Sequence, residues 1–153
     1  MIQSVNNSGR SLTARLVTLS AANISAALVS GAFGAVALAD PSVLVGAPVT
    51  SDLATGFYVD LYALRSLVIA AAIVSASATM RRAPLVAAIV LIGAGLVQVG
   101  DVAIAARFAT PGVVGACVAA LVHLASAALL VRYIRSARRA ALCERDNSLN
   151  DSR

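Results

Sequence analysis

The sequence predicts an all-α membrane protein, an up-down bundle of four transmembrane helices with both termini in the cytoplasm. Three observations support this prediction. Four apolar stretches are each about as long as a helix that crosses a bilayer. Only 12% of the residues are charged and mean hydropathy is +0.88, and a soluble fold of 153 residues could not bury so much apolar surface. Arginines cluster at alternate breaks between the stretches, as the positive-inside rule requires.

The first predicted span, residues 16–39, follows a polar N-terminal segment, residues 1–15. We expect residues 1–9 of that segment to be disordered, because they offer little apolar surface to bury. Ala37-Leu38-Ala39 resembles a signal-peptide cleavage site, but the apolar stretch is longer than the roughly 7–15 residues of a signal core. We therefore expect this helix to be retained; cleavage, which would leave three spans, is the alternative.

Three further spans complete a transmembrane domain over residues 16–134, and a basic tail follows at 135–153. The spans are predicted at 57–79, 85–106 and 113–134. The Pro- and Gly-containing connection before them is expected to be a loop, with a short interfacial helix as the alternative. Pro84 suits the first turn of the third span.

The arginines orient the chain in the membrane. They cluster in the N-terminal segment, at Arg81-Arg82 and after the fourth span, whereas the two other connections hold none or only Arg107. This distribution places both termini in the cytoplasm. All 12 basic residues are Arg, and with the abundant Ala and Val this indicates a GC-rich, bacterial genome. The predicted location is a bacterial plasma membrane, crossed several times.

Several classes of site are not predicted. Nucleic-acid binding is not, because no stacking aromatic residues alternate with the arginines. Neither Cys117 nor Cys143 belongs to a CxxC motif or a His/Cys cluster, so we expect no metal. No cofactor motif is present. The expected partners are the lipid bilayer, a lipophilic small molecule and a second copy of this chain.

Small residues recur on one face of three spans, where they let membrane helices approach closely. We expect these faces to pack inside the bundle and His123 to point inward. The repeats are Ala27, Gly31 and Ala35 in the first span, Gly93 and Gly100 in the third, and Ala119, His123 and Ala127 in the fourth.

Polar residues inside the spans are the best lead to a site; they are Asn23, Arg65, Gln98, Asp101 and His123. Counting about 1.5 Å per residue from the span ends places Arg65, Gln98 and Asp101 at one level, in the outer half of the bilayer. An unpaired Asp there costs about 2.5–3.5 kcal/mol, whereas a long Arg side chain can reach the headgroups. We therefore expect Arg65 to pair with Asp101, with Gln98 as a further hydrogen-bonding group.

The roles of these residues stay open at this point. The Arg65–Asp101 pair either fixes the packing or forms a ligand or catalytic site. His123 is either a satisfied interior residue or a proton carrier or general base. Tyr58, Asp60 and Tyr62 either belong to the interfacial belt or rim a pocket that opens outward.

The segment Phe57–Leu67, the Arg81-Arg82 turn and Gly100-Asp101 resemble small four-span bacterial membrane proteins classed as a domain of unknown function. Members show a Gly-x-Arg-Asp motif on the second span and an Asp late in the third, which Arg65 and Asp101 match. Ala63 and Ser66 stand where Gly and Asp are usual. The resemblance implies a four-helix membrane fold and no established activity.

Three functions are compatible with these features. The first is a non-enzymatic membrane protein that binds or carries a lipophilic small molecule or serves as an interaction subunit. The second is a small membrane enzyme, with Asp101 or His123 as acid or base and Arg65 as electrostatic partner. The third is a proton-coupled exporter, although such four-span exporters usually carry a Glu in the first span, and this chain has none there.

Overall fold

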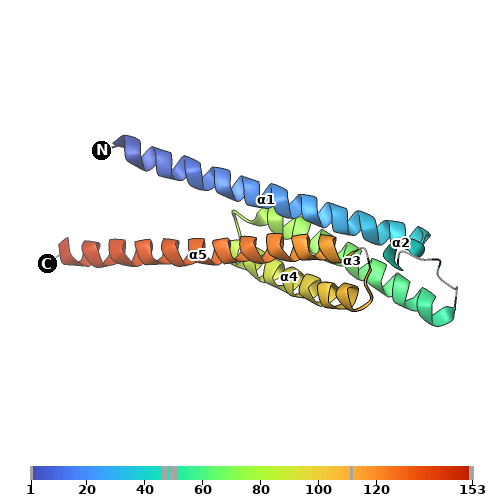
Figure 1. Cartoon of the computed structure of the whole chain (residues 1–153). Coiled ribbons are helices and arrows are strands. Elements are labelled where there is room, and N and C mark those ends of the chain that lie inside the picture. The colour runs from blue at the N-terminus through green and yellow to red at the C-terminus, as the bar shows by residue number, and fades with distance from the viewer. Residues whose placement is uncertain (1, 46–47, 49–51, 111, 152–153) are drawn as a thin grey trace.

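The computed structural model describes residues 2–45, 48, 52–110 and 112–151, and these residues are almost entirely helical (Figure 1). The helices are α1 (Ile2–Ala39), α2 (Ser42–Val45), α3 (Leu53–Thr79), α4 (Pro84–Arg107) and α5 (Val113–Asp151). In this part of the chain four helices are long and apolar enough to cross a membrane, over Ala14–Ala39, Gly56–Thr79, Pro84–Arg107 and Val113–Cys143. The prediction of an all-α chain with four helices long and apolar enough to cross a membrane is therefore confirmed.

The ends of the chain differ from the prediction. The expected disorder of residues 1–9 is wrong for residues 2–9, because α1 already begins at Ile2; Met1 lies outside the described residues. Once the apolar span is helical, each further residue adds a hydrogen bond at little cost, so the helix extends through the polar segment. The basic tail is helical as well, since α5 continues to Asp151. Figure 1 shows α1 and α5 extending past the α3–α4 connection at the same end of the molecule.

Local sequence explains where the helices begin and end. Pro84 occupies the first turn of α4, as predicted, where its missing N–H costs no hydrogen bond. At the other end of α4, Thr110 N–H donates to the Ala105 carbonyl at 3.0 Å. Ala109, which directly precedes Thr110, has φ 52°, a left-handed conformation that is usually adopted by Gly. The expected alternative of a short helix in the first connection is α2.

The long helices contact one another in chain order around a ring, α1 on α3, α3 on α4, α4 on α5, and α5 on α1. The pairs α1–α3 and α4–α5 are packed most extensively. In the first pair, a Cβ built on Gly34 would lie 2.9 Å from the Ser66 Cβ, and one on Gly31 would lie 3.1 Å from the Ala70 Cβ. In the second pair, a Cβ on Gly95 would lie 2.6 Å from Leu124 side-chain atoms. The fold is thus two close helix pairs joined along two thinner interfaces.

The small-residue prediction is partly wrong. Ala27, Gly31 and all three residues of the fourth-span repeat are buried, but Ala35 is exposed. Gly93 and Gly100 have no atom within 4 Å of an added Cβ, so they do not form a packing face. The reason is rotational: the side of α4 that meets α5 passes through Gly95, and Gly93 lies about 200° around the helix from it.

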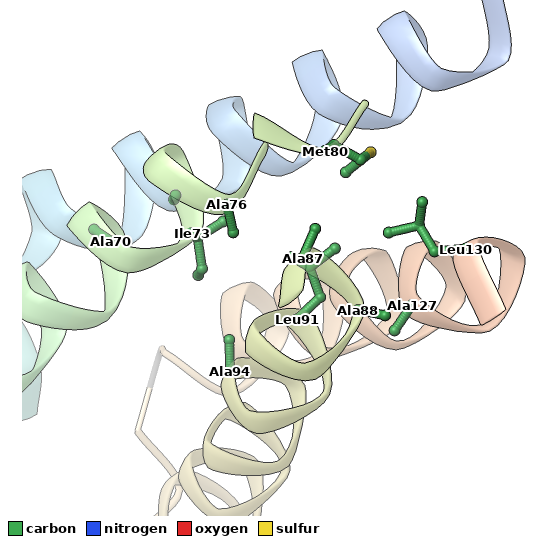
Figure 2. Packing of buried hydrophobic residues seen from close by; sticks show 11 residues of the cluster. Ala70, Ile73, Ala76, Met80, Ala87, Ala88, Leu91, Ala94, Ala127 and Leu130 are labelled. Atoms are coloured by element: carbon green, nitrogen blue, oxygen red, sulfur yellow. The ribbon is translucent and has the colours of Figure 1, made fainter. Parts of the chain in front are cut away.

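The core between the helix pairs is made of small and medium-sized apolar side chains. Figure 2 shows Ile73 of α3, and Met80 just after the end of α3, on the side of Ala87 and Leu91 of α4, with Leu130 of α5 nearby. The outer surface is apolar too, and among the large exposed side chains are Leu64 (61%), Leu96 (62%) and Leu121 (70%). A protein in water does not keep such a surface, whereas a lipid-facing surface requires it.

Candidate functional site

Arg65 of α3 and Asp101 of α4 form an ion pair, with 2.5 Å between Arg65 Nη2 and Asp101 Oδ1. This confirms the predicted pairing across the second and third spans. The Asp101 side chain is 14% exposed and that of Arg65 is 39% exposed. The guanidinium also lies over the ring of Tyr62, at 5.2 Å from the ring centroid. The short acid is therefore enclosed, while the long base reaches toward the surface of the bundle.

The pair is simpler than the predicted group of three. Gln98 is half-buried on α4, and within the described part of the chain no hydrogen bond joins it to Arg65 or Asp101. The Arg65 Nε is buried without a hydrogen-bond partner there. The ion pair neutralises two charges across the thin α3–α4 interface, and it can act on a neighbouring group only through its electric field.

A second polar cluster lies on the other thin interface, between α1 and α5. Asn23 Nδ2 donates to Ser126 Oγ at 2.8 Å and to the Leu19 carbonyl at 2.7 Å. Asn23 Oδ1 lies 2.8 Å from His123 Nδ1. Asn23 and His123 are fully buried and Ser126 is 2% exposed. The inward direction predicted for His123 is therefore confirmed.

The geometry of this cluster assigns the proton on the imidazole. A carbonyl can only accept, so the Asn23 amide must turn its Nδ2 toward Leu19 and its Oδ1 toward His123. His123 Nδ1 is then the donor, and in the neutral form of the ring Nε2 is the acceptor. Nε2 is buried, and no described residue donates a hydrogen bond to it. The cluster thus holds an oriented imidazole with one basic nitrogen free.

The two polar contacts hold the two helix pairs together. Arg65–Asp101 joins α3 to α4, and Asn23 joins α1 to α5 through His123 and Ser126. Apolar packing gives membrane helices little reason to choose one partner over the surrounding lipid, whereas interhelical polar contacts do. These residues therefore favour this docking of one pair on the other, together with the apolar core that lies between the pairs.

Two open grooves lie near the end of the bundle where α1 begins and α5 ends. The larger, of about 640 Å³, runs between α1 and α5. It is lined by Ala14, Arg15, Leu16, Thr18, Leu19, Leu129, Arg132, Tyr133 and Ser136. The smaller, of about 390 Å³, runs between α1 and α3 and includes Ser77 and Arg81. Sites for small molecules typically have volumes of about 300–1,000 Å³ and mainly apolar walls.

The remaining predicted residues line neither of these two grooves. Tyr58 and Asp60 are exposed on α3, and the Tyr58 ring meets that of Phe57 edge-on at 5.7 Å. Cys117 is half-buried and Cys143 exposed, both as free thiols. Among the described residues, no three His, Cys, Asp or Glu side chains come together as metal ligands would.

Sequence reasoning missed two features of the site. Ser126 was invisible because its only signal is a spacing of three residues from His123, which matters once α1 is known to face it. The groove was missed because Arg15 and Arg132 were interpreted only as residues that orient the chain in the membrane. The sequence alone does not show that they line the same groove. In comparisons with models of protein families, with curated proteins and with solved structures, nothing matches this chain.

Proposed function

We propose that this protein crosses a bacterial plasma membrane four times as an up-down bundle with both termini in the cytoplasm. The arginine clusters, the four apolar helices and the common end of α1 and α5 support this arrangement. Cys143 offers a direct test in a Cys117→Ser background, because it is exposed on α5. A membrane-impermeant maleimide should label Cys143 only after the cells are broken. In a matched variant that replaces both native cysteines and carries Asp60→Cys, labelling should occur in intact cells.

We further propose that the protein binds or carries a lipophilic small molecule and does not catalyse a reaction. The groove of about 640 Å³ between α1 and α5 carries this proposal. Its walls are formed mainly by the apolar side chains Leu16, Leu19 and Leu129. It opens where two helices of the bundle diverge (Figure 1), so a molecule can enter from the membrane without unfolding either helix.

A photoactivatable fatty alcohol, which is lipophilic and uncharged, tests this proposal on the purified full-length protein. Crosslinks located by mass spectrometry should fall on residues that line the groove, such as Leu16, Leu19, Leu129 and Tyr133. Thr18→Trp should fill the groove and abolish them, because Thr18 is exposed and lines it. The control Leu28→Trp lies on the same helix, is exposed, and lines neither groove. Crosslinks that are spread over all lipid-facing helices, or that survive Thr18→Trp, would contradict the proposal.

One observation favours an enzyme as the second candidate. His123 Nε2 is a free acceptor whose imidazole is oriented by Asn23 at 2.8 Å, as a general base requires. Substrate would have to reach the buried nitrogen by separation of α1 from α5. In that case a lipid-soluble substrate should show turnover that is lost in His123→Gln while the helix content of the protein stays unchanged.

A further inference from the structure

The charged residues that line the large groove are all positive. Arg15 on α1 and Arg132 on α5 both line it, and both are exposed. No acidic side chain is among its described lining residues. Nor does either guanidinium take part in an ion pair within the part of the chain whose side chains are described. Two uncompensated positive charges therefore flank an apolar hollow.

Two hydroxyl groups of the groove, those of Thr18 and Ser136, are engaged within their own helices; the third belongs to Tyr133. The Thr18 hydroxyl donates to the Ala14 carbonyl at 3.1 Å, and the Ser136 hydroxyl donates to the Tyr133 carbonyl at 2.8 Å. These bonds lie within single helices, so neither hydroxyl proton is available to a ligand in the groove. The groups left to recognise a ligand are therefore the two arginines, the Tyr133 hydroxyl and the apolar walls.

From this arrangement we infer that the groove between α1 and α5 binds an anionic membrane phospholipid. The headgroup phosphate lies between Arg15 and Arg132, because guanidinium groups match phosphate oxygens in geometry and charge. The first part of an acyl chain lies along Leu16, Leu19 and Leu129. This inference rests on the proposed function and names the class of its ligand.

The position of the arginines suits this ligand. Arg15 is the second residue of the apolar stretch Ala14–Ala39, and Arg132 lies in the second half of the stretch Val113–Cys143. Both positions are toward the end of the bundle at which α1 and α5 extend past the α3–α4 connection (Figure 1). Under the proposed topology this is the cytoplasmic face, at headgroup depth. Each basic residue near an anionic leaflet is worth about a fivefold change in binding, so two should give a preference of about 25-fold.

The test measures binding of phosphatidylglycerol and of phosphatidylcholine with identical acyl chains to the purified full-length protein, by native mass spectrometry. The wild-type protein should prefer phosphatidylglycerol by about 25-fold, and Arg15→Gln/Arg132→Gln should lose this preference. The matched control is Arg135→Gln/Arg138→Gln, which removes the same charge from α5 outside the groove and should keep the preference. Inorganic phosphate at millimolar concentration should not displace the lipid, because it lacks the acyl chain.

Three results would overturn the inference. They are equal binding of the two lipids, equal loss of preference in both double variants, and displacement by inorganic phosphate. The second result would mean that general surface charge, and not the groove, attracts the lipid. Crosslinking of the uncharged fatty alcohol separates this failure from that of the proposed function. If the alcohol still labels the groove while the lipid preference is absent, the protein binds a lipophile of another class.

Discussion

The Arg65–Asp101 pair should respond asymmetrically to loss of its two members. Arg65→Gln leaves an ionised Asp101 whose side chain is 14% exposed and too short to reach water. Breaking a fully buried pair costs about 3–5 kcal/mol, and an unpaired Asp at mid-membrane about 2.5–3.5 kcal/mol. Because the Arg65 side chain is 39% exposed, the site is only partly enclosed. We therefore expect Arg65→Gln to lower the free energy of unfolding by about 2–3 kcal/mol.

Asp101→Asn should cost less, about 1 kcal/mol. The Arg65 guanidinium can either keep a hydrogen bond to the new amide or extend to the headgroups. The double variant Arg65→Gln/Asp101→Asn should be more stable than the sum of the single effects predicts, by about 1–2 kcal/mol. Exchanging the two charges in Arg65→Asp/Asp101→Arg should recover part of the loss.

Unfolding by SDS in mixed micelles, followed by circular dichroism, measures these differences. Arg107→Gln and Asp60→Asn serve as controls, because they remove the same charges from exposed positions of the same two helices. Equal costs for the two single variants would contradict the predicted asymmetry, and strict additivity in the double variant would show that the pair does not couple α3 to α4.

Three further predictions concern backbone geometry and one carboxylate. Gly34→Ala should lower the free energy of unfolding by about 1–3 kcal/mol in the same assay, because the new Cβ would lie 3.2 Å from the Ala63 carbonyl oxygen. Gly93→Ala should be neutral or stabilising, because no atom lies within 4 Å of the new Cβ. A larger loss of stability in Gly93→Ala than in Gly34→Ala would refute this packing. Ala109→Gly should raise the stability by about 0.5–1 kcal/mol, because φ 52° strains any residue with a Cβ; no gain would argue against the left-handed turn. The pKa of Asp40 is lowered by hydrogen bonds from the Ser42 hydroxyl (2.6 Å) and the Ser42 N–H (3.0 Å). The ionised Asp40 carboxylate therefore stabilises the fold fully at pH values above the ordinary Asp pKa, and this stabilisation is lost as the pH falls through the lowered pKa of Asp40. Ser42→Ala should raise this pKa in an NMR titration, and an unchanged value would exclude the bond as its cause.

Much of the Arg65–Asp101 site could be predicted because its signals are one-dimensional. Depth follows from the residue count along a helix of known rise, so two charges on neighbouring antiparallel spans can be placed at one level. The cost of an unpaired Asp in the membrane then implies a partner. Gln98 shows the limit of this reasoning: it shares the level but makes no hydrogen bond to the pair among the described residues, because level alone does not determine the direction of a side chain.

By itself, the sequence determined the helical class, the four apolar spans and the pairing of their two buried charges, because hydropathy and charge cost act residue by residue. Only the tertiary structure decided which faces meet. It placed Gly34 and Gly95 at the contacts instead of Gly93 and Gly100, and it brought Asn23 to His123. It also opened the groove beside Arg15 and Arg132. These features depend on the rotation of each helix about its own axis. An apolar sequence places few constraints on this rotation, and the close packing of the helices determines it.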